Sequence, residues 1–125
     1  MNQKSANECV GGPKLIFACS GAADVGEISD RAARNMSRDG AGKMFCLAGI
    51  AGRIPGIMKM TESASQILAI DGCELDCVKN CLGNAGFKEF EHFRVTDLGM
   101  EKGNATVNND NIAKVVANGK EMMVS

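Results

Sequence analysis

Short apolar runs alternate with amphipathic stretches along this chain. The run KLIFAC at 14–19 lies between GGP at 11–13 and SG at 20–21, as expected for a strand buried on both faces of a parallel sheet. Apolar positions then recur at helical spacing from Asp24, where Asp24 as N-cap and Glu27 predict a capping box. Asp39 and Gly40 are expected to end this helix.

The same alternation continues to the end of the chain. A second strand is expected over 42–48, followed by a connection with a short helical turn over 54–60. The later segments predict a strand at 66–70, a helix at 74–82 closed by Gly83 or Gly86, a strand at 90–96 and a helix at 109–117 capped by Asn109 or Asp110.

Alternating strands and helices predict an α/β fold. The connections are long enough for right-handed crossovers, so we expect a mostly parallel sheet of about four strands with helices on both faces, a three-layer sandwich. Residues 1–12 read as a polar lead-in and 13–125 as a single domain, whose strand order the pattern does not give. One edge of so small a sheet is often buried in a dimer, which leaves a homodimer as one arrangement.

Composition and charge argue against several classes of binding partner. Fourteen basic residues are interspersed with 15 acidic ones, and no basic stripe exists to follow a nucleic-acid backbone. No apolar run approaches the roughly 20 residues that a membrane span needs. The start of the chain lacks the apolar region of a signal peptide, so a cytoplasmic location is expected. In that reducing compartment, six cysteines indicate metal binding or thiol chemistry more often than disulfides.

Three cysteines lie where predicted strands end. Cys19 ends the first strand, Cys46 lies near the end of the second, and Cys73 follows the third. Parallel strands place their carboxyl ends at one edge of the sheet, where open α/β sheets have their sites. Cys77, in the first turn of the following helix, is expected to point back to this edge. Cys81 lies one turn farther along the same helix and is expected to be too deep to join.

Four thiolates at one edge are suited to a tetrahedral soft metal ion. Thiolates select Zn²⁺, Cu(I) or an iron–sulfur cluster over Mg²⁺ or Ca²⁺. The N-terminus of the predicted 74–82 helix is expected to offset part of their negative charge. The alternative without metal chemistry is that each cysteine packs as a small hydrophobic residue of the core. His92 and Asp71 are expected to be structural, Asp71 as a turn-forming residue.

Four segments carry a family resemblance. IDGC at 70–73 with Cys77, FACSGAA at 17–23, CLAGI at 46–50 and VTDLG at 95–99 resemble the DGC-domain family, small prokaryotic proteins described as zinc-binding. The match extends from about Leu15 to Val116. The resemblance implies four characteristic cysteines, which fall on Cys19, Cys46, Cys73 and Cys77, and it implies no established reaction.

The leading hypothesis is a zinc-binding protein whose metal is structural or handled for a partner. Four protein ligands leave no open position for a substrate water, which argues against hydrolytic catalysis and for a protein that is not an enzyme. The alternatives are a thiol-based redox enzyme or sensor using Cys19 or Cys73, and an iron–sulfur protein. The roles of Cys9 and Cys81 stay open.

Overall fold

The fold is built on one parallel sheet. The computed structural model describes residues 11–123, and within them four strands pair in the order β2-β1-β3-β4. The strands are β1 (Lys14–Ala18), β2 (Lys43–Met44), β3 (Gln66–Asp71) and β4 (Glu91–Arg94). Every neighbouring pair is parallel, so all four carboxyl ends lie at the same edge.

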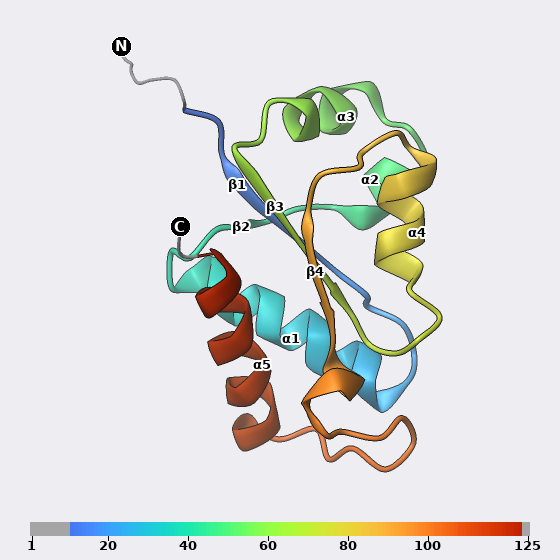
Figure 1. The fold of residues 1–125 in the computed structure, drawn as a ribbon, viewed down its shortest axis with the longest axis vertical. Coiled ribbons are helices and arrows are strands. Elements are labelled where there is room, and N and C mark those ends of the chain that lie inside the picture. Colours follow the sequence, from blue (N-terminus) through green and yellow to red (C-terminus); the bar gives the residue numbers. More distant parts are fainter. Residues whose placement is uncertain (1–10, 124–125) are drawn as a thin grey trace.

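Helices cover both faces of this sheet (Figure 1). On one face lie α1 (Asp24–Arg38) and α5 (Asn109–Met123), with the short 3₁₀ helix η1 (Val95–Leu98) beside them. On the other face lie α2 (Leu47–Ala51), α3 (Pro55–Glu62) and α4 (Cys77–Asn84). The predicted three-layer α/β sandwich is thereby confirmed.

The central strands are buried on both faces because each layer supplies its own apolar core. Ile16 of β1 and Leu68 of β3 pack towards α1 and α5 and are fully buried. The alternate residues Leu15 and Phe17 pack towards α2 and α4 and are equally buried. An uninterrupted apolar run such as 14–19 has this cause: neither side of the strand meets water.

Several predicted elements have different boundaries. The second strand stops at Met44, and helix α2 occupies 47–51, which overlaps the end of the apolar segment predicted as a strand. The helix predicted from 74 begins only at Cys77. Asp76 has a φ of 54° in the left-handed region, so no continuous helix can pass through it. The last helix runs past the predicted end at 117 to Met123.

The predicted N-terminal caps were wrong in a consistent way, whereas Asp39 with Gly40 does end α1 and Gly86 does follow the C-cap of α4. The N-cap of α1 is Ala23, not Asp24, and no side chain caps it. The Asp24 carboxylate instead accepts hydrogen bonds from the N–H groups of Gly103 and Ala105, both at 3.0 Å. For α5, Asn108 is the capping side chain: its Oδ1 accepts the N–H of Asn111 at 2.8 Å.

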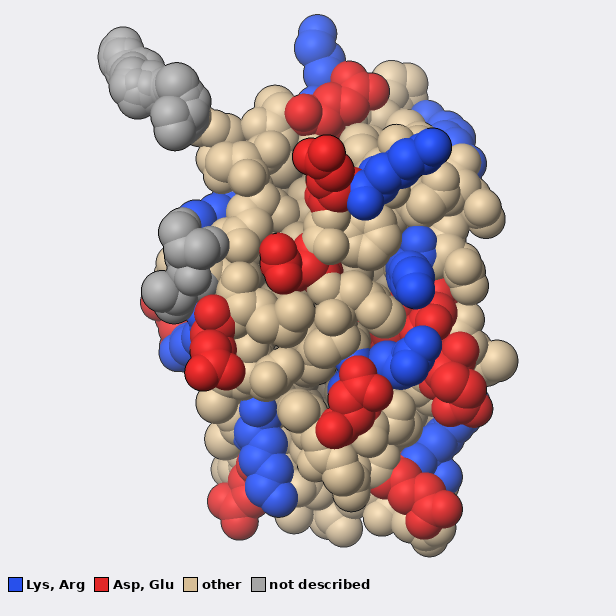
Figure 2. Space-filling model, in the orientation of Figure 1, with Lys and Arg blue, Asp and Glu red and all other residues tan. Residues whose placement is uncertain are grey.

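The molecular surface carries mixed charge. On the face drawn in Figure 2, acidic and basic side chains are interspersed among uncharged ones and form no continuous basic area. No helix within residues 11–123 is long and apolar enough to cross a membrane. Cys9 and most of the predicted 1–12 lead-in lie outside the described residues, so the predicted domain limits stay a prediction.

Replacing Asp24 by Ala should release the loop before α5. The N–H groups of Gly103 and Ala105 lose their acceptor, and the same two bonds are the main reason that the pKa of Asp24 lies below its ordinary value. Amide hydrogen exchange at Gly103 and Ala105, followed by NMR, should become much faster.

The matched control is Glu27→Ala. Glu27 lies in the same helix turn as Asp24, and its carboxylate pairs with Arg31 instead of the loop. Unchanged protection of the two loop amides in Asp24→Ala would contradict the role assigned to this tether.

Candidate metal centre

Two cysteines meet where the strand order reverses. The chain passes from β1 to β2 on one side and then to β3 on the other side of β1. Cys19 directly follows β1, and its N–H donates to the carbonyl of Ile70 at 2.9 Å, extending the ladder between β1 and β3. Cys73 follows β3 and is buried. The two cysteines therefore lie at the switch point, where ligands of open α/β sheets bind.

Cys77 joins them from the start of α4. It is the first residue of that helix and is exposed. Partial burial of the sulfur raises the pKa of the Cys77 thiol, and the nearby thiol of Cys19 adds to the effect, as Asp71 and Cys73 also do. Cys19, Cys73 and Cys77 are defined here as the inner cysteines.

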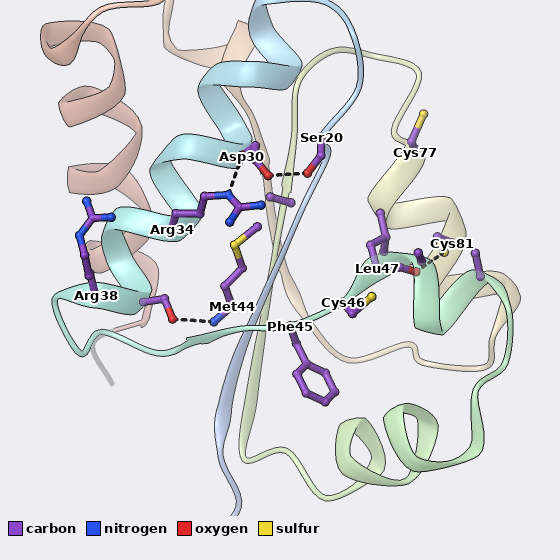
Figure 3. A pocket seen from close by; sticks show the side chains of 14 residues that line it. Ser20, Asp30, Arg34, Arg38, Met44, Phe45, Cys46, Leu47, Cys77 and Cys81 are labelled. Carbon is purple, nitrogen blue, oxygen red and sulfur yellow. Dashed lines mark hydrogen bonds and ion pairs between the residues drawn. The ribbon is translucent and has the colours of Figure 1, made fainter.

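Cys46 approaches from the other side, through an open groove. It is the exposed N-cap residue of α2. With Cys77 and Cys81 it lines a groove of about 1040 Å³ that reaches α1 at its other end (Figure 3). Cys81, expected to be too deep, is half-buried and reaches this groove.

The thiols are near one another without being in ligand contact. A tetrahedral zinc site with Zn–S near 2.3 Å needs sulfurs about 3.8 Å apart. In residues 11–123, the one group of three possible ligand atoms within 4.8 Å is Asp71, Asp76 and His92, not a set of thiols. The donor set fits a soft metal in chemistry, and because Cys46 and Cys77 are exposed their side chains have room to rotate towards an ion.

The Asp71 group is an internal network rather than a second metal site. Oδ1 of Asp71 accepts the N–H of Val78 at 2.7 Å, and Oδ2 accepts that of Lys79 at 3.1 Å. Oδ2 also lies 2.9 Å from Nε2 of His92. Because Asp71 is 1% exposed, these donors compensate the cost of burying its charge.

The second carboxylate of the group is neutralised separately. Asp76 accepts two hydrogen bonds from Arg94, both at 2.7 Å, in a bidentate pair. The pair holds the pKa of Asp76 below its ordinary value, chiefly through the Arg94 hydrogen bond. The Arg94 guanidinium thus supplies the positive charge that a metal ion would otherwise bring to Asp76.

These contacts change the role expected for the start of α4. Asp71 takes the N–H groups of Val78 and Lys79, which were expected to offset the charge of the thiolates. A cation does lie beside one of the cysteines: Nζ of Lys102 is 3.6 Å from Sγ of Cys73. Lys102 comes from the loop that Asp24 tethers.

Sequence reasoning missed Lys102 and the function of Asp71. Asp71, expected to form a turn, instead caps a helix that begins six residues later. No sequence signal points to this role, because Asp76, a common capping residue, stands directly before the helix and yet makes no capping hydrogen bond. Nothing in the sequence around Lys102 marks it, since its contact with Cys73 spans 29 residues.

The comparisons with known proteins agree with this picture. The family model described as "DGC domain" matches residues 15–118. A curated relative, "Anaerobic and virulence modulator AnvM" from Pseudomonas aeruginosa, is 34% identical over 88 residues, which cover 70% of this chain and 67% of the relative. No solved structure matches.

Replacing Asp71 by Asn should destabilise the fold. The amide group of Asn cannot accept the N–H groups that now point at both oxygens, so one buried donor is left unpaired. We expect a loss of about 1–3 kcal/mol in the free energy of unfolding. Far-UV circular dichroism in urea measures it, because the chain has neither Trp nor Tyr for fluorescence.

A loss below about 0.5 kcal/mol, the range of ordinary surface substitutions, would show that Asp71 does not hold α4. The control Asp97→Asn changes a carboxylate that is half exposed and contacts only Arg94.

The pair of Asp76 and Arg94 predicts an acid-dependent term in stability. Since the pKa of Asp76 is lowered in the folded chain, its contribution is present above the ordinary value of 3.8 and is lost as the pH falls below it. The wild type should exceed Asp76→Asn in unfolding free energy by a constant amount near neutral pH, and the difference should shrink in acid.

Asn is the matched substitution because it tolerates the left-handed backbone found at position 76. Urea unfolding of both proteins across acidic pH tests the prediction, and a difference that stays constant down to the most acidic point would refute it.

Proposed function

Because the chain belongs to the DGC-domain family, we propose that it binds one zinc ion through the thiolates of four residues, Cys19, Cys46, Cys73 and Cys77. The observation that supports this proposal is that Cys19 and Cys73 follow the neighbouring strands β1 and β3 at the switch point, with both thiols near enough to Cys77 to affect its pKa. Cys46 supplies the fourth ligand from the groove side.

The charge around the inner cysteines supports a bound metal. Four thiolates around Zn²⁺ carry a net charge of −2, which is costly to hold beside the apolar core. Lys102 places an ammonium group 3.6 Å from the most buried of the sulfurs, that of Cys73. The five described cysteines are free thiols, as ligation requires.

The proposed role is to hold or transfer the metal rather than to catalyse a reaction. A site closed by four protein ligands has no position for a reacting water. A modulator, as the name of the relative describes that protein, can act by handing metal to a partner.

The cellular setting follows from the same chemistry. Free thiols that must stay reduced to ligate a metal suit the cytoplasm, which we propose as the location. The mixed surface charge gives no support for a nucleic-acid partner.

Elemental analysis of anaerobically purified protein tests the proposal. We expect about one zinc ion per chain, the stoichiometry of a closed four-thiolate site. Cys73→Ser should lose most of this metal, because it removes the buried ligand. Cys9→Ser is the matched control, since Cys9 lies outside the four-cysteine pattern and its replacement should leave the zinc content unchanged.

Three results would count against a zinc site of this kind. Metal below about a tenth of an equivalent would contradict binding altogether. The presence of iron together with acid-labile sulfide would show that the protein holds an iron–sulfur cluster instead of zinc. Full zinc content in the Cys73→Ser variant would show that the zinc site does not depend on Cys73 and therefore lies away from the inner cysteines.

A further inference from the structure

The groove beside the inner cysteines contains a thiol that the four-ligand pattern leaves out. Cys81 lies on α4 one turn after Cys77 and lines the groove together with Cys46. Its Sγ lies 3.9 Å from the carbonyl oxygen of Leu47, the residue that follows Cys46 in the chain. Figure 3 shows the Cys81 side chain directed towards this carbonyl at the start of α2.

The cysteines differ in how far solvent reaches them. Cys73 is buried and does not line the groove, whereas Cys46 is exposed and lines it. Cys77 connects the two regions, because it lines the groove and the neighbouring thiols of Cys19 and Cys73 contribute to raising the pKa of its own thiol. An ion that enters from solvent through the groove therefore meets Cys46 and Cys81 before it meets Cys73.

The position of Cys81 suits a temporary ligand better than a permanent one. Its Sγ lies beside the Leu47 carbonyl next to Cys46, and both cysteines line the groove, whereas Cys73 is buried and does not line it. An ion bound by Cys46 and Cys81 would therefore lie on the groove side of the buried Cys73, from where it can pass inwards.

We propose that Cys46 and Cys81 form an outer thiol pair that receives a soft metal ion in the groove. The ion then passes to Cys77, the inner cysteine that lines the groove, and from there to Cys19 and Cys73. The inference rests on the proposed function and extends it with an entry site. The ligand class is a thiophilic cation such as Zn²⁺ or Cu(I).

Each transfer step is a ligand exchange with no change of oxidation state. The incoming thiol loses its proton to solvent as its metal–sulfur bond forms. The outgoing Cys81 sulfur takes up a proton as its own bond to the metal breaks. Cys46 keeps its bond throughout, so the ion always retains a protein ligand.

Metal-dependent alkylation of the Cys73→Ser variant tests the outer pair directly. This variant lacks a complete inner site, so Zn²⁺ added to it should slow the alkylation of Cys46 and Cys81 more than that of Cys19, read by mass spectrometry. Equal alkylation of Cys81 with and without Zn²⁺ would overturn the proposal. The variant's circular dichroism spectrum confirms that it is folded.

Metal release from the full-length protein provides the second measurement. Zinc should leave Cys81→Ser for a chromophoric chelator on the order of tenfold more slowly than it leaves the wild type, while the zinc content at equilibrium stays the same. Ser20→Ala is the control, because Ser20 lines the same groove without a thiol and should release zinc at the wild-type rate.

The outcomes separate this inference from the function on which it rests. Wild-type protein that binds no zinc defeats both. Protein that holds zinc through the inner cysteines, but shows wild-type release in Cys81→Ser, defeats the outer pair alone. A lowered equilibrium zinc content in Cys81→Ser would make Cys81 a permanent ligand and would also overturn the transfer role.

Discussion

The buried carboxylate of Asp71 joins three elements that carry the site. It lies at the end of β3, accepts two N–H groups of the first turn of α4, and contacts His92 on β4. A carboxylate this deep is tolerated only because donors surround it, and each donor fixes the position of the element that carries it. Cys73 and Cys77 both lie in the segment between Asp71 and the N–H of Val78 that it accepts, so the path of this segment depends on Asp71.

The same anchor explains how negative charge is distributed around the cysteines. The carboxylate of Asp71 accepts N–H groups of the first turn of α4, and Arg94 pairs with Asp76. Neither these N–H groups nor Arg94 are therefore available to balance the charge of thiolates in the proposed site. Lys102 is the cation left at Cys73, and it depends on a loop whose own tether is Asp24. Electrostatic support for the inner cysteines thus comes from the far end of the sequence.

Local sequence patterns predicted the sheet and the positions of Cys19 and Cys73 after two of its strands. Strands 14–18 and 66–71 were recognisable because burial on both faces leaves continuous apolar runs. The strand order, the left-handed residue at Asp76 and the contact of Lys102 with Cys73 were not predictable in this way. Each depends on residues distant in the chain, and no periodicity of apolar positions records such contacts.

The arrangement of the thiols bears on why metal transfer is favoured over a purely structural ion. A structural zinc is normally enclosed by ligands that fold around it, whereas Cys46 and Cys77 of the proposed ligand set are exposed and line the groove. Neither of these two residues belongs to the apolar clusters that pack the two faces of the sheet. Exposed ligands can exchange a bound ion with a partner more readily than enclosed ones, which is the property that the proposed metal transfer needs.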